Sequence, residues 1–145
     1  MLLVLRSAAD VQALIGRHPA TGEARSYLNE RVEKPWGCEE QVYADSHISL
    51  TRLMMKPGMA TSLHCHIGKT ALMSVEDGGA TVETLQGSHD IGAHGIVTLQ
   101  PGAFHRIKAG GQGATVWEIE SPGNKGDIVR LADDHGRVGR GYEGS

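Results

Sequence analysis

The sequence predicts an all-β domain with a short helical arm at its N-terminus. From about Glu39 onward, short runs rich in Val, Ile, Thr and Leu alternate with segments rich in glycine and proline. The chain holds 20 glycines, which indicates many turns between short strands. Regular short strands with no long helical pattern between them are typical of an antiparallel sandwich or a small barrel.

The N-terminal arm is expected to span residues 1–31. Ser7 is a suitable N-cap, residues 8–15 favour a short helix, and Gly16 can end it. The rest of the chain, 32–145, is expected to form a single domain, because 145 residues is close to the commonest domain size.

The strands are expected within six apolar runs and the turns within the segments between them. The runs are 40–44, 48–55, 71–75, 80–85, 95–99 and 114–120, and the turn segments are 56–59, 76–79, 86–95, 100–103 and 109–113. Together they place a barrel over roughly 32–121. The polar, glycine-rich tail that follows is expected to pack on the barrel without joining its sheets.

Composition excludes several classes of function. The net charge of −3 implies no broad basic surface, so we expect no nucleic-acid partner. No apolar run approaches the ~20 residues that span a bilayer, and "MLLVLRSAAD" lacks the features of a signal peptide. Cys38 and Cys65 suggest no disulfide framework. We therefore expect a cytoplasmic protein without membrane contact.

Three histidines form the strongest candidate for a functional site. His64 and His66 stand two apart in "SLHCHIG", and residues i and i+2 of a strand share a face. His105 follows a Pro-Gly turn in "GIVTLQPGAFHRI", which can aim it inward. Three neutral imidazoles that leave coordination positions open are typical of a catalytic metal centre. The pair alone also fits two polar residues on a solvated strand face.

The two histidine blocks resemble the two motifs of the cupin superfamily, a double-stranded β-helix or jelly-roll barrel. The first motif is His-x-His followed by a glutamate and a glycine, and the second is Gly-x5-Pro-Gly-x2-His. The matching residues are His64, His66, Gly78, Gly95, Pro101, Gly102 and His105.

Two further stretches resemble the type II phosphomannose isomerase-like cupins. They are "VEKPWGCEE" (32–40) and "GDIVRLADDHGR" (126–137), so the resemblance covers roughly 32–137. In that group the domain either isomerises sugar phosphates or accompanies a sugar-nucleotide transferase. The resemblance therefore implies one divalent metal on His64, His66 and His105, with zinc favoured and manganese or iron as alternatives.

The chain departs from the family pattern at the metal site. Ala71 stands where the family carries its glutamate ligand, and Lys69 stands where it carries an arginine. His64 replaces a common glutamine. The implied metal set is three histidines without a carboxylate, which suits zinc and also ferrous iron.

Glu118 and Glu120 are the candidate proton-transfer groups. They share one strand face in "WEIES", and either one could act as a base or supply the missing ligand. A solvated charged face is the competing interpretation. Lys69 and Arg130 complete the catalytic candidates.

The candidate substrate contacts are mostly cationic, because a phosphate or sugar acid needs donors. They are Lys34, Arg106, Arg137 and His135. For each cation, a surface salt bridge is the competing interpretation.

These observations predict a metal-dependent isomerase or epimerase of the phosphomannose isomerase-like type, acting on a small sugar or sugar phosphate. A three-histidine iron dioxygenase and a non-catalytic sugar-binding cupin are the alternatives. A homodimer is expected, since barrels of this kind often pair.

Overall fold

The computed structural model describes residues 1–19, 27–123 and 126–138, in which ten strands and one helix occur. The helix is α1 (Ala8–Leu14). The strands are β1 (Leu2–Val4), β2 (Arg31–Lys34), β3 (Gly37–Ala44), β4 (Ser49–Met55), β5 (Leu63–Cys65), β6 (Thr70–Thr84), β7 (Gly87–Ile91), β8 (Ile96–Leu99), β9 (His105–Ser121) and β10 (Val129–Ala132). The predicted all-β fold with a short N-terminal helix is confirmed.

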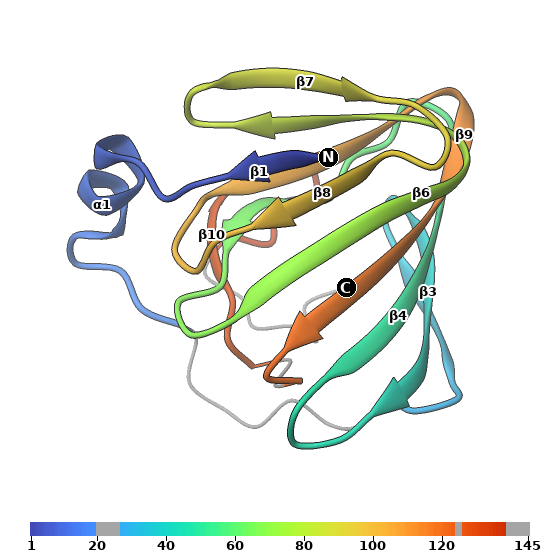
Figure 1. Cartoon of the computed structure of the whole chain (residues 1–145), viewed down its shortest axis with the longest axis horizontal. Coiled ribbons are helices and arrows are strands. Elements are labelled where there is room, and N and C mark those ends of the chain that lie inside the picture. The colour runs from blue at the N-terminus through green and yellow to red at the C-terminus, as the bar shows by residue number, and fades with distance from the viewer. Residues whose placement is uncertain (20–26, 124–125, 139–145) are drawn as a thin grey trace.

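A long antiparallel ladder between β6 and β9 organises the sheet. The main strand order is β1-β8-β6-β9-β4-β3-β2, and β7 pairs with β6 while β5 bridges β9 and β10. Figure 1 shows β6 and β9 crossing the molecule side by side. Because β9 pairs with β4, β5 and β6, it brings together residues that are far apart in the sequence.

Two of the expected turns lie inside these long strands. Segments 76–79 and 109–113 are bends in β6 and β9, and the ladder shifts register beside Gly78. Gly78 has φ +76°, and a Cβ there would lie 2.2 Å from the carbonyl oxygen of Gly113. Glycine therefore lets the two strands bend together. The residues that suggested a turn in the sequence mark a bend within a continuous pair of strands.

Strands β1, β2, β7 and β10 lie outside the six expected runs. β1 runs parallel to β8, and β7, within the expected turn 86–95, pairs with β6. The expectation that the tail stays outside the sheets was wrong, because β10 pairs with β5.

The helix α1 begins at the expected N-cap and ends one residue earlier than expected, at Leu14. Ser7 and Asp10 form a capping box, in which each side chain accepts a hydrogen bond from the other's backbone N–H. Residues 20–26 of the expected N-terminal arm lie outside the described residues. The division at residue 31 stays a prediction. At seven residues, α1 is too short to cross a membrane, and it is the one helix of the described ranges.

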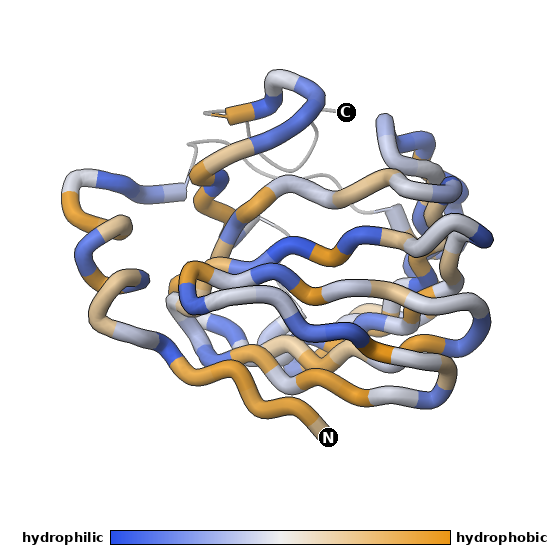
Figure 2. Tube along the Cα trace, turned by 90° about the horizontal axis from the view of Figure 1, so that it is seen from above, coloured by the Kyte–Doolittle hydropathy of each residue, from blue (hydrophilic) through white to orange (hydrophobic). Residues whose placement is uncertain are grey.

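Two apolar clusters fill the fold. The larger cluster packs the inner faces of the long strands. Figure 2 shows that the apolar N-terminal strand β1 runs along the barrel. The smaller cluster contains Cys65, Phe104 and Val129, with Ala13 and Leu14 of α1 packed against it. Cys65 and Phe104 are both fully buried and adjoin the three histidines in the chain. The small cluster therefore anchors the backbone segments that carry the three histidines.

Candidate metal centre

The fold brings His64, His66 and His105 into one cluster. His64 on β5 is the direct cross-strand partner of His105 at the start of β9. The Gly102 N–H in the Pro-Gly turn donates to the His66 carbonyl oxygen at 2.7 Å. The ring centroids lie 4.6–5.6 Å apart, and one potential ligand atom from each ring lies within 4.8 Å of the others. Backbone pairing thus joins the two histidine blocks.

Backbone carbonyls orient all three imidazoles alike. The Nδ1 atoms of His64, His66 and His105 lie 2.8, 2.6 and 2.9 Å from the carbonyl oxygens of Ser62, Asp127 and Ala103. A carbonyl oxygen only accepts hydrogen bonds, so each Nδ1 carries the proton. In a neutral imidazole this leaves the Nε2 lone pair free to coordinate a metal.

The surroundings keep the three rings neutral. Burial lowers the pKa of His64 well below its usual value, and the charges that His105 and His66 would carry lower it further. Burial likewise lowers the pKa of His66 to about 4 and lowers that of His105. Neutral imidazole is the form that binds metals, so these histidines are prepared for a cation.

The cluster fits a divalent metal ion. The Nε2 atoms of His66 and His105 are buried and have no hydrogen-bond partner among the described residues. Burying an unpaired acceptor costs free energy, which a coordinated ion would offset. Three imidazole nitrogens leave at least one position open for a water or a substrate oxygen.

Two acidic residues that the sequence interpretation overlooked position the cluster. The Asp127 carboxylate accepts hydrogen bonds from the N–H groups of Ile67 and Gly68 at 2.9 and 2.7 Å, beside His66. The Asp10 carboxylate accepts one from the Phe104 N–H at 2.9 Å, beside His105. Asp127 lies in the stretch 126–137 that resembles the cupin family, so the sequence could have identified it as a site residue. The sequence around Asp10, at the helix N-terminus, offered no such indication.

A cavity opens from His64 and His66 toward solvent, with a volume of about 580 Å³ including its open mouth. Its wall is unusually rich in charge for a buried surface. The charged lining residues are Lys34, Glu39, Lys69, Glu118, Glu120, Arg130 and Arg137. Trp36 and Met73 contribute apolar surface.

Both candidate glutamates line this cavity and are buried, at 7% exposure for Glu118 and 2% for Glu120. They alternate along β9 with half-exposed neighbours, as strand geometry requires. The solvated-face interpretation of the pair is therefore wrong. Lys69 also lines the cavity and contacts the Glu120 carboxylate, with both side chains almost fully buried.

Position 71 faces the interior of the barrel. Ala71 is 1% exposed and is two residues from Met73, which lines the cavity, so the two share a strand face. Position 71 therefore holds a buried methyl group on β6 where the resembled motif has a carboxylate.

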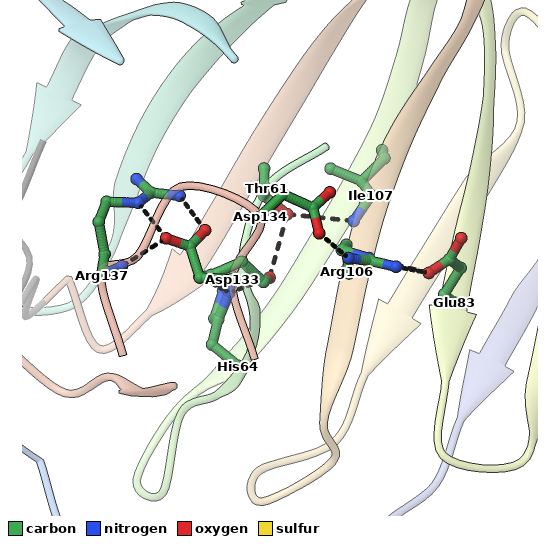
Figure 3. Close-up of polar contacts among 9 residues, drawn as sticks. Thr61, His64, Glu83, Arg106, Ile107, Asp133, Asp134 and Arg137 are labelled. Carbon is green, nitrogen blue, oxygen red and sulfur yellow. Dashed lines mark hydrogen bonds and ion pairs between the residues drawn. The ribbon is translucent and has the colours of Figure 1, made fainter. Parts of the chain in front are cut away.

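Two arginines lie on the cavity wall beside the histidines. Arg130 on β10 is the direct cross-strand partner of His64, and its Nε donates to the Ser62 Oγ at 3.2 Å. Burial and the neighbouring charge of Arg137 lower the pKa of Arg130 to about 10. Arg137 is held by two side-chain hydrogen bonds of 2.9 and 2.8 Å to Asp133 (Figure 3). The wall thus gathers positive charge next to the metal site.

Two predicted substrate contacts lie apart from the cavity lining. The Arg106 guanidinium is engaged by Glu83 at 2.5 and 2.8 Å and by Asp134 at 3.2 Å, as Figure 3 shows. For Arg106 the salt-bridge interpretation is the one that the structure favours. His135 is partly buried and is not among the cavity-lining residues either.

Comparison with known proteins gives sequence relatives and fold relatives. No protein-family model matches the chain. Mannose-1-phosphate guanylyltransferase of Escherichia coli is 27% identical over 143 residues, covering 95% of this chain and 30% of the relative. The xanthan biosynthesis protein XanB of Xanthomonas campestris is 24% identical over 132 residues, covering 89% and 28%. The chain therefore spans less than a third of the length of these curated relatives.

Solved structures establish the fold. KdgF from Halomonas sp. superposes with a TM-score of 0.61 at 15% identity, covering 68% of this chain and 94% of that one. Oxalate decarboxylase of Bacillus subtilis gives 0.65 at 18% identity, covering 77% and 34%. A Klebsiella pneumoniae protein with a double-stranded β-helix domain gives 0.63 at 18% identity, covering 79% and 100%. The predicted cupin fold is confirmed.

Proposed function

We propose that this cupin-fold chain binds one divalent metal ion, preferably zinc, and isomerises or epimerises a small sugar or sugar phosphate. One observation carries the proposal: the three-histidine cluster, a buried carboxylate and buried arginines line or adjoin a single cavity. Sequence similarity to a mannose-1-phosphate guanylyltransferase supports a sugar phosphate as the ligand class.

His64, His66 and His105 would hold the metal through their Nε2 atoms. A bound divalent ion would polarise the adjacent carbonyl and hydroxyl oxygens of a sugar. The proton that an aldose–ketose isomerisation moves between neighbouring carbons then becomes more acidic.

Glu118 is our candidate for the proton-transfer group. It is buried at 7% exposure and lines the same cavity as His64 and His66. In the proposed isomerisation its carboxylate would take the proton from one sugar carbon and return it to the neighbouring carbon, while the hydroxyl proton moves in the same direction, from the oxygen of the carbon that loses its proton to the oxygen of the neighbouring one. A positioned carboxylate contributes typically ~10²–10⁴-fold to such a transfer.

Arg130 and Arg137 are the candidate contacts for an anionic group. Both are buried on the cavity wall, where a phosphate or carboxylate would offset their mutual repulsion. Lys34, buried on the same wall, is a further candidate. Trp36 offers an aromatic surface for a sugar ring.

Metal binding is tested first. Freshly purified wild type, His66→Ala and His105→Ala are analysed for bound metals. Wild type should hold about one equivalent and each variant should lose it, because an ion with only two protein nitrogens is held weakly. Stoichiometric metal in both variants would contradict this site.

Activity is tested by isotope exchange. Metal-loaded protein is incubated with a panel of sugar phosphates in heavy water, and deuterium in the sugar is measured by mass spectrometry. We expect exchange in wild type, a loss of at least ~100-fold in Glu118→Gln, and no loss in Glu33→Gln, whose side chain is exposed on β2.

Other outcomes of this test favour the alternatives. A neutral three-histidine set also suits ferrous iron, so oxygen consumption by the iron-loaded protein would favour a dioxygenase. Tight sugar binding without exchange would favour a non-catalytic sugar-binding cupin. The homodimer stays a prediction, for which light scattering is the measurement.

A further inference from the structure

An acidic side chain lies directly opposite the position where the metal centre lacks its carboxylate. Ala71 on β6 pairs with Glu120 on β9 across the antiparallel ladder. Directly opposite residues of such a ladder project from the same face, with their Cβ atoms about 4.5–5.5 Å apart. A carboxylate at position 71 and one at position 120 would therefore enter the cavity from adjacent points of one wall.

Small residues flank Glu120 on both sides. Its partner on β4 is Ser49, and its partner on β6 is Ala71. Ser49 and Ala71 are 0% and 1% exposed, so the longer Glu120 side chain is the one that fills this part of the wall. A glutamate at position 71 would therefore compete with Glu120 for the same space.

Lys69 restrains the Glu120 carboxylate. The two side chains form an ion pair and are 1% and 3% exposed. Burying either charge alone would be costly, so each stabilises the other. The pair is also close to the candidate metal centre, because Lys69 and Glu120 line the same cavity as His64 and His66.

We infer that Glu120 replaces the carboxylate missing from position 71 and becomes an oxygen ligand of the metal, released from Lys69 when the ion binds. Glu120 is outside the group of potential ligand atoms formed by the histidines, and Lys69 engages it. A divalent cation attracts the carboxylate more strongly than a single ammonium group does. This inference rests on the three-histidine metal site of the proposed function.

The inference predicts opposite effects for the two members of the ion pair. Glu120→Gln removes the ligand charge, so zinc affinity should fall about 10–100-fold. Lys69→Met removes the competitor of the metal, so zinc affinity should rise. A purely structural ion pair predicts instead that both variants lose folding stability while zinc affinity stays the same.

Zinc affinity is measured by competition with a chromophoric chelator, and the coordination sphere is followed by the visible absorption of the cobalt-substituted protein. Ala71→Glu combined with Glu120→Gln should restore both the affinity and the cobalt spectrum of wild type. Glu118→Gln is the matched control, since it lies in the same cavity but pairs with Met73, and its zinc affinity should stay near wild type.

Several results would overturn the inference. They are an unchanged zinc affinity and cobalt spectrum in Glu120→Gln, an equal loss in Glu118→Gln, or a weaker zinc affinity in Lys69→Met. If Lys69→Met does not fold, the zinc affinities of Glu120→Gln and of the double variant Ala71→Glu with Glu120→Gln test the inference. One combination of results would overturn this inference and leave the metal site of the proposed function intact. In that case His66→Ala loses zinc binding, whereas Glu120→Gln binds zinc with the affinity of wild type.

Discussion

Replacing Asp10 with alanine should reveal how strongly the N-terminal helix supports the metal centre. Asp10 is 3% exposed, and its carboxylate accepts hydrogen bonds from the N–H and Oγ of Ser7, both at 2.8 Å, and from the Phe104 N–H at 2.9 Å. Asp10→Ala therefore breaks the capping box and leaves the buried Phe104 N–H without this partner.

The expected cost follows from these contacts. Loss of a helix N-cap interaction costs about 1 kcal/mol, and a buried donor left unsatisfied costs about 1–3 kcal/mol. The free energy of unfolding should thus fall by roughly 2–4 kcal/mol, which lowers the melting temperature by roughly 5–15 °C in a chain of this size.

Ser7→Ala is the control, because it removes the hydroxyl of the cap and keeps the bond from Asp10 to Phe104. It should cost only about 1 kcal/mol. Both variants are compared with wild type by urea and thermal unfolding of the metal-free protein, followed by circular dichroism. Zinc affinity should fall in Asp10→Ala only, because Phe104 adjoins His105. Equal destabilisation by the two substitutions would refute the proposed role of the Phe104 contact.

Three further predictions concern packing, backbone conformation and acid stability. Phe104→Ala should lower the free energy of unfolding by about 3–5 kcal/mol, since the ring is fully buried; a loss below about 1 kcal/mol in urea unfolding would contradict its role in the small cluster. Gly78→Ala should cost more than about 1 kcal/mol because of its φ of +76° and a backbone oxygen 2.2 Å from the new Cβ. Gly111→Ala, where a Cβ meets nothing within 4 Å, is the control, and equal losses would refute the steric argument. Burial acts to raise the pKa of Asp133, but hydrogen bonds and charge from Arg137 outweigh it and lower that pKa below its usual value. The Asp133 carboxylate therefore stabilises the fold above about pH 4 and loses this contribution as pH falls through its folded pKa; Asp133→Asn should flatten the acid limb of stability against pH, and an unchanged limb would contradict the assignment.

Local patterns in the sequence were sufficient to predict several of the strands and the three-histidine set. The period of two in 114–120 predicts a half-buried strand, and β9 contains it. His64 and His66 share a face for the same reason, and the Pro-Gly turn orients His105. These features depend on neighbours in the chain, which the sequence displays directly.

Features that depend on distant partners escaped local patterns. Segments 76–79 and 109–113 look like turns separately, but they bend together inside one ladder because Gly78 allows close contact with the opposite strand. The strand β1 became visible only through its pairing with β8. Arg106 has the composition of a substrate contact, yet Glu83 and Asp134 engage it.

The sequence by itself determined the fold class, the three-histidine set and the absence of a carboxylate at position 71. Only the tertiary structure decided which charges surround that set. Glu120 lies opposite Ala71, and Arg130 lies opposite His64, through the register of strands that are more than 40 residues apart in the chain. Register is a property of paired backbones, and the apolar core and glycine bends select it over the whole barrel. Spacing along one chain therefore predicted the candidate metal ligands, whereas the cavity wall that would act on a substrate arose from packing.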